Sequence, residues 1–107
     1  MKIKIKETTY QDKEVNVEFP YYRQHDVSGD NYESIYYTKI IDEKTKISLN
    51  CSSRHGEKSW EMEIDRSNVF SDSNNSNYIL GRGEYKLSEE EFNAKVKEFK
   101  EFVNKYL

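Results

Sequence analysis

Two histidines and one cysteine are the residues of this sequence best suited to metal binding or nucleophilic chemistry. Cys51 and His55 stand four residues apart, and His25 lies in a polar segment that could approach them. Thiolate and imidazole ligands bind zinc, and a Cys–His pair can act as a nucleophile with its base. The second ligand pair of a specific zinc motif is missing, however, and Cys51 falls in the apolar phase of its predicted strand. We therefore predict a buried structural cysteine, with no metal, no cofactor and no catalytic residues.

A glycine-flanked arginine is the second candidate for chemistry. Gly81-Arg82-Gly83 could present backbone N–H groups and a guanidinium to a phosphate. It is not a Walker loop, because the Gly-Lys-Ser/Thr ending is absent, and a turn or a β-bulge explains both glycines without a ligand. Phosphate or nucleotide binding by Arg82, assisted by Arg23, is therefore kept as an alternative interpretation.

An acidic row is the third candidate. Glu61, Glu63 and Asp65 alternate with apolar residues, which places the three carboxylates on one face of a strand, about 6.6 Å apart. The segment from Glu57 to Glu91 has nine acids and four bases, a local charge of −5, whereas residues 1–13 have four bases and two acids, or +2. The row contains no His or Lys that would supply a contrasting pKa for acid–base catalysis. A solvated strand face explains the alternation, and a basic protein partner is the functional interpretation.

Length and composition indicate one small, polar, folded domain covering residues 1–107. Leu, Ile, Val and Phe account for 23 of 107 residues, about 21%, which is just above the level typical of disorder. The abundance of Tyr, Asn and Ser suits a recognition surface. The enrichment in Tyr, Lys, Asn and Ile also reflects AT-rich coding, as in a phage or another mobile element.

Cellular location and partner class follow from what the sequence lacks. Cys51 is the single cysteine, and the start Met1-Lys2-Ile3-Lys4-Ile5-Lys6 has no continuous apolar segment, so we expect a cytoplasmic protein. No apolar run is long enough to span a bilayer, so we expect no membrane association. The pI near 5.5, without a dense Lys/Arg stripe, argues against nucleic acid as the partner.

The C-terminal residues predict a helix over about 89–106. Ser88 and Glu91 fit a capping box, in which the Ser88 hydroxyl accepts from the Glu91 N–H and the Glu91 side chain returns to the Ser88 N–H. Leu87 and Phe92 supply the accompanying hydrophobic staple. Apolar residues then recur at helical spacing, and we expect this stripe to pack on one face of a sheet, on Trp60, Met62, Ile64, Ile47 and Leu49.

The preceding residues, about 1–86, read as that sheet. Alternating or β-branched segments predict strands at residues 1–6, 15–19, 34–41, 46–52 and 60–65, with shorter ones near 78–80 and 84–86. Residues 23–31 and 66–77 read as polar loops. The fold class is therefore α+β, with a five- or six-stranded antiparallel sheet and one C-terminal amphipathic helix on one face.

One helix covers one side of the sheet, whereas the 34–41 segment is apolar on both sides. Either Tyr36 and Ile40, or Ile35, Tyr37 and Ile41, would then face away from the helix, and Tyr21 or Tyr22 could extend that patch. Such a face would form a homodimer or contact a target protein. In the alternative arrangement, loop 66–77 folds back and covers it with Val69 and Phe70.

The functional hypothesis is a small cytoplasmic protein-binding module without catalysis, of the inhibitor or immunity type. Its partner-binding residues would be Glu61, Glu63, Asp65, Tyr36, Tyr37 and Tyr22. The alternative is a small enzyme or a phosphate- or nucleotide-binding domain that uses loops 23–31 and 66–77 near Arg82.

Overall fold

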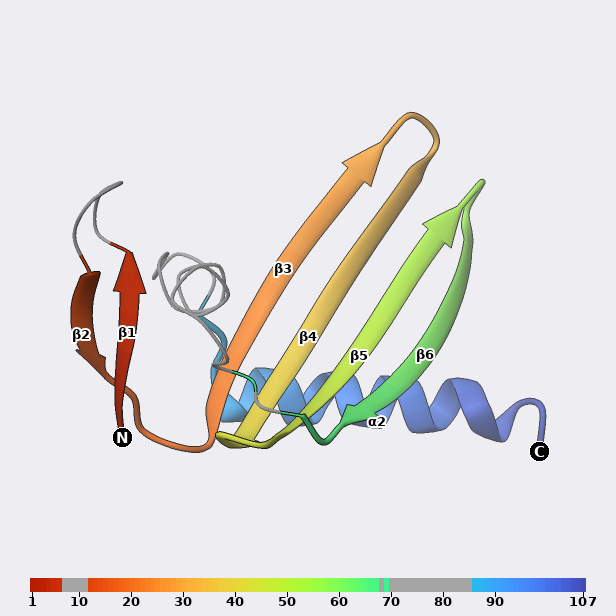
Figure 1. The fold of residues 1–107 in the computed structure, drawn as a ribbon. Helices are drawn as coiled ribbons and strands as arrows, with labels where there is room; N and C mark the ends of the chain where they lie inside the picture. The colour runs from red at the N-terminus through yellow and green to blue at the C-terminus, as the bar shows by residue number, and fades with distance from the viewer. Residues whose placement is uncertain (7–11, 68, 70–85) are drawn as a thin grey trace.

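The computed structural model describes residues 1–6, 12–67, 69 and 86–107. In chain order, the elements are a short hairpin, four long strands and a helix (Figure 1). Their bounds are β1 (Lys2–Lys6), β2 (Asp12–Asn16), β3 (Tyr21–Gly29), β4 (Tyr32–Asp42), β5 (Thr45–Arg54), β6 (Glu57–Asp65) and α2 (Glu89–Asn104). The predictions for Phe70 and for Gly81-Arg82-Gly83 fall outside the described residues.

The main sheet is an antiparallel meander in the order β3-β4-β5-β6, and α2 lies across one of its faces (Figure 1). This arrangement confirms the α+β class, the antiparallel pairing and the C-terminal helix. Among the described residues the sheet has four strands rather than five or six, because β1 and β2 pair with each other in a separate two-stranded sheet. The short strands predicted near 78–80 and 84–86 fall, apart from Lys86, outside the described residues. Pro20 lies between β2 and β3, and a residue without an N–H cannot continue the ladder.

The largest error of the sequence prediction concerns residues 23–31, which were expected to form a loop. Residues 21–29 are instead strand β3, paired along its whole length with β4. Beyond Tyr22 its residues are polar on both faces except for Val27, so it lacks the apolar alternation by which strands are recognised. Backbone pairing with the strongly β-prone β4 overrides this weak local preference.

The turns between the long strands are short. Asp42 and Thr45 are paired, and the Lys44 N–H donates to Asp42 Oδ1 at 2.8 Å. At the next turn, Arg54 pairs with Glu57, and Gly56 has a φ of +83°. Both turns were predicted, the second from the ability of glycine to adopt positive φ. Two-residue connections of this kind fix the strand register.

The start of α2 confirms the predicted N-cap. The Glu91 N–H donates to Ser88 Oγ at 3.1 Å, and Leu87 and Phe92 are both buried in the same cluster. The return bond differs from the expectation, since the Ser88 hydroxyl donates to Glu91 Oε1 at 3.0 Å. The helix ends at Asn104, two residues before the predicted end.

The core between helix and sheet is concentrated at the start of α2. Its buried members come from the helix, from the residue before its cap and from three strands: Phe92, Leu87, Tyr22, Tyr37 and Leu49. Partly buried residues extend this cluster: Ile35, Cys51, Trp60, Val96 and Phe99. The Tyr22 and Phe92 rings lie 5.5 Å apart between centroids, and those of Tyr37 and Trp60 lie 6.2 Å apart.

The predicted contact of α2 with Met62 and Ile64 is wrong. These side chains are 50% and 57% exposed, although alternation places them on the helix-covered face. The helix packs instead over Tyr22, Tyr37 and Leu49, and it meets β6 at Trp60, before these two residues. The β6 end of this face is therefore left open around Met62 and Ile64.

The Phe92→Ala substitution tests this core. Phe92 is buried and joins the helix to Tyr22, so its truncation should lower the free energy of unfolding by about 3–5 kcal/mol. Lys97→Ala, on the exposed side of the same helix, should change it by less than about 0.5 kcal/mol. Urea denaturation of both variants gives the two values. Equal stabilities for the two variants would contradict the packing described here.

Candidate functional site

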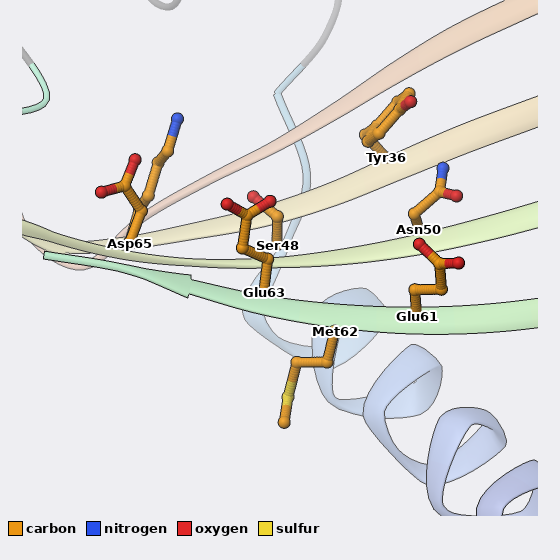
Figure 2. Close-up of a pocket in the computed structure, with 8 residues that line it drawn as sticks. Tyr36, Ser48, Asn50, Glu61, Met62, Glu63 and Asp65 are labelled. Carbon is orange, nitrogen blue, oxygen red and sulfur yellow. The ribbon is translucent and has the colours of Figure 1, made fainter.

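The face of the four-stranded sheet opposite α2 is the candidate functional surface, and we call it the open face. Alternation and register place on it Tyr36 and Thr38 from β4, Ser48 and Asn50 from β5, and the acidic row from β6. In Figure 2, the side chains of Tyr36, Ser48 and Asn50 lie on this side, and Met62 points to the other, where α2 lies. The face that the helix leaves free is therefore mainly polar.

The acidic row is formed as predicted from the alternation. Glu61, Glu63 and Asp65 project from β6 on the open face (Figure 2). Glu61 and Glu63 are exposed, and Asp65 is half-buried. Across the β5–β6 ladder they face Asn50, Ser48 and Lys46, respectively. Sequence reasoning missed these neighbours, although the alternation of residues 46–51 and the Arg54–Glu57 turn together determine the pairing.

Hydroxyl and amide groups form a bonded network beside the row. Asn50 Nδ2 donates to Ser34 Oγ at 2.7 Å, and the Ser52 hydroxyl donates to Asn50 Oδ1 at 2.9 Å. The Ser34 and Ser52 hydroxyls lie 3.3 Å apart. These bonds fix the side chains of β4 and β5 in place. The network gives the open face a rigid polar floor rather than the apolar patch that was expected.

A groove of about 400 Å³ lies beside this network and shares Asn50 with it. It is lined by residues from three strands: Tyr36, Lys46, Ser48, Asn50, Glu61, Met62, Glu63 and Asp65. Tyr36 stands at the centre of the sheet with 41% of its surface exposed. The groove therefore combines an accessible aromatic ring, three carboxylates and one ammonium group.

The apolar end of the open face is covered. Ile40 is 1% exposed and packs with Val69, while Phe19 and Tyr21 flank the pair. The Val69 N–H donates to the Glu43 carbonyl at 2.9 Å, which holds Val69 over the sheet. The alternative in which the segment after β6 folds back is thus observed for Val69. It removes Ile40 from the surface and leaves Tyr36 accessible.

Two of the predicted partner-binding tyrosines lie in the core. Tyr22 and Tyr37 expose 8% and 4% of their surface and pack beneath α2. Burial raises the pKa of both phenols, and the Glu89 and Glu90 carboxylates raise that of Tyr22 further. A partner that docks on the open face cannot reach these rings. Tyr36 and the acidic row are the predicted residues that remain accessible.

The described residues considered for metal binding or nucleophilic chemistry, Cys51, His25 and His55, do not come together as a site. Arg23 is buried on β3, where the backbone bridges to Lys86, and Arg82 lies outside the described residues. Cys51 is half-buried on the helix-covered face, and burial raises its thiol pKa, which disfavours the nucleophilic thiolate. His25 belongs to β3 and His55 to the β5–β6 turn. Within the described part of the chain, no three His, Cys, Asp or Glu residues are grouped to hold a metal ion.

The Asp65 carboxyl has a pKa below its ordinary value. The Ser67 hydroxyl donates to Asp65 Oδ1 at 2.7 Å and the Ser67 N–H donates to the same atom at 3.1 Å. The hydroxyl bond makes the largest contribution to lowering the Asp65 pKa, with help from the N–H and from Lys46. This carboxylate therefore stays charged at neutral pH and suits attraction of cations rather than proton transfer.

Comparison with known proteins adds no relative. No protein-family model matches this chain, and no curated protein or solved structure is significantly similar to it. Among the described elements, no helix combines the length and the apolar character needed to cross a membrane.

The Ser67→Ala substitution tests the electrostatics at Asp65. Loss of the hydroxyl bond should raise the Asp65 pKa toward its ordinary value, because the carboxylate loses its strongest stabilising donor. Because the Asp65 pKa is lower in the folded state than in the unfolded state, the carboxylate stabilises the folded protein at pH values above the unfolded-state pKa. This stabilisation is lost as the pH falls through the folded-state pKa. Carboxyl-carbon NMR titration of both proteins measures the shift. An unchanged Asp65 pKa would show that the hydroxyl does not set it.

Proposed function

We propose that this protein is a non-catalytic binding module that covers a basic surface of another protein, in the manner of an inhibitor or immunity protein. The observation that carries the proposal is the placement of Glu61, Glu63 and Asp65 on the open face beside the exposed Tyr36. The proposal includes a cytoplasmic location and an origin in a phage or mobile element, as suggested by the single cysteine and the AT-rich composition.

Electrostatics support a cationic partner. Three carboxylates line the groove and Lys46 supplies one positive charge, so the surface attracts Lys and Arg side chains. Charge complementarity of this kind speeds association and excludes partners of the same sign. The acidic groove also repels nucleic-acid phosphates, which supports a protein as the partner.

The neighbouring groups support recognition. Tyr36 offers a large ring with few rotatable bonds, and aromatic residues of this type are frequent at protein interfaces. Asn50, Ser34 and Ser52 are already held by mutual hydrogen bonds, so binding would order them at little entropic cost. A preorganised polar floor with one aromatic residue is typical of adaptable recognition surfaces.

The alternative of a small enzyme or phosphate-binding domain loses one of its premises. It required a loop at 23–31, and residues 23–29 are part of β3. Arg23 is buried rather than exposed at a loop tip. The remaining premises, Arg82 and most of loop 66–77, lie outside the described residues.

Charge reversal tests the proposal. Glu61→Lys, Glu63→Lys and Asp65→Lys together should leave the circular dichroism spectrum unchanged, because these side chains project from the open face of an edge strand. Binding to the partner isolated with the wild-type protein should weaken by at least about tenfold and lose much of its salt dependence. Calorimetry at two salt concentrations measures both effects.

A matched variant controls for net charge. Glu18→Lys, Glu33→Lys and Glu101→Lys make the same change at exposed positions off the open face, and this protein should bind like the wild type. If the folded open-face variant binds as tightly as the control, the acidic row is a solvated surface and the proposal is wrong.

A further inference from the structure

The outer edge of β6 is a second feature of the sheet that can bind a partner. β6 is the last strand of the sheet and pairs with β5 on its inner side (Figure 1). Among the strands that the structure describes, none pairs with its outer side. The opposite edge differs, since Arg23 bridges to Lys86 and the Leu87 N–H donates to the Tyr22 carbonyl at 3.2 Å.

The hairpin geometry shows which backbone groups of β6 point outward. Arg54 and Glu57 flank a two-residue turn, so their N–H and C=O groups are directed at each other. In an antiparallel ladder this direction alternates, and the backbone groups of the intervening residues point away from β5. By this rule, the outward-facing residues are Lys58, Trp60, Met62 and Ile64.

The side chains next to these groups form two different stripes. On the open face, β6 carries Glu61, Glu63 and Asp65. On the other face, Met62 and Ile64 are about half exposed, because α2 does not cover them. A strand laid along this edge would have carboxylates beside it on one side and aliphatic surface on the other.

We propose that the β6 edge binds an extended segment of a partner protein in which basic and apolar residues alternate, and that this segment adds a fifth strand to the sheet. Its Lys or Arg side chains would lie beside the acidic row, and its apolar side chains would cover Met62 and Ile64. Main-chain hydrogen bonds would supply affinity and the alternating side chains specificity. This inference rests on the proposed function and names the form in which the partner is recognised.

Charge determines which occupant fits. If two copies of β6 paired edge to edge, their acidic rows would come together, and like charges on neighbouring strands are destabilising. The carboxylates thus protect the edge from self-association, as charged residues on edge strands do. The first strand of this chain has the required alternation, but it is already paired with β2, and Ile3 is buried. A basic segment of another protein therefore fits best.

A peptide experiment tests the edge directly. The probe is a short, fluorescently labelled peptide that alternates Lys and Val, and its control has the same composition with all Lys residues in one block. The alternating peptide should bind the wild-type protein at least about tenfold more tightly than the block peptide. Only the alternating peptide, when extended, places its Lys side chains on one face and its Val side chains on the other. Fluorescence polarisation measures both affinities at the same salt concentration.

Backbone methylation separates strand addition from attraction by charge alone. Two variants of the alternating peptide are used, one N-methylated at the odd positions and the other at the even positions. Both keep all side chains, and each loses the N–H donors along one edge of the strand that it would form. Methylation along the pairing edge should abolish binding. If the block peptide or both methylated peptides bind as well as the alternating peptide, strand addition is wrong.

A substitution in β6 tests the same backbone pairing by changing the protein instead of the peptide. Met62→Pro removes an outward N–H from an edge strand, which is the position in a sheet where proline is tolerated. It should lose peptide binding, whereas Met62→Ala, which keeps the N–H, should retain most of it. If a folded Met62→Pro protein binds the peptide like the wild type, the inference is overturned.

The outcomes also distinguish this inference from the proposed function. If the methylated peptides bind normally and the charge-reversed protein still fails to bind the isolated partner, the edge is excluded and the open-face proposal stands. If sedimentation shows that the protein alone forms a dimer and that Met62→Pro is a monomer, a second copy occupies the edge and the inference is wrong.

Discussion

The contact of Leu87 and Phe92 with Tyr22, Tyr37 and Leu49 is the interaction on which the rest of the structure depends. It joins the N-terminal end of α2 to three neighbouring strands, and it contains most of the buried side chains of the helix-covered face. The position of the Ser88 cap, directly before Phe92, fixes where the helix starts relative to this cluster. Because the helix is anchored there, its remaining length crosses toward β6 without reaching Met62 and Ile64.

In the described part of the chain, α2 covers one face of the four-stranded sheet, and the other face is stabilised in a different way. Here it is divided into two parts. One end is apolar and covered, with Ile40 under Val69, and the rest carries hydroxyl and amide groups that bond to one another. A sheet face of this kind can remain exposed without the aggregation hazard of a large apolar patch. The polar part of the open face is left uncovered for this reason, and it is the surface available for recognition.

Local patterns in the sequence predicted the parts of the fold that depend on neighbouring residues. The Ser88–Glu91 cap, the turns at 42–45 and 54–57, and the central position of β4 all follow from residue type and short spacing. The strand at 21–29 could not be predicted in this way, because its pairing with β4, and not its own side chains, makes it a strand. The exposure of Met62 and Ile64 depends on the path of α2, which no local pattern encodes.

In the candidate site, too, local patterns predict some features and only tertiary contacts decide the others. The alternation from Trp60 to Asp65 was sufficient to place the three carboxylates on one face, and the structure confirms that placement. The phase of the 34–41 strand remained ambiguous, because both of its faces are apolar in sequence. The structure resolves it by placing Tyr37 under the helix and Tyr36 in the groove. Only the tertiary arrangement decides which of two adjacent tyrosines is accessible.

The order of the elements along the chain has a consequence for synthesis. The four long strands form consecutive hairpins with short turns, so each can pair as soon as it leaves the ribosome. The residues that cover Tyr37 and Leu49, however, come from Leu87 onward, well after the last strand ends at Asp65. During translation the nascent sheet must therefore expose these side chains until α2 emerges, and the completed chain then closes its core in a late step.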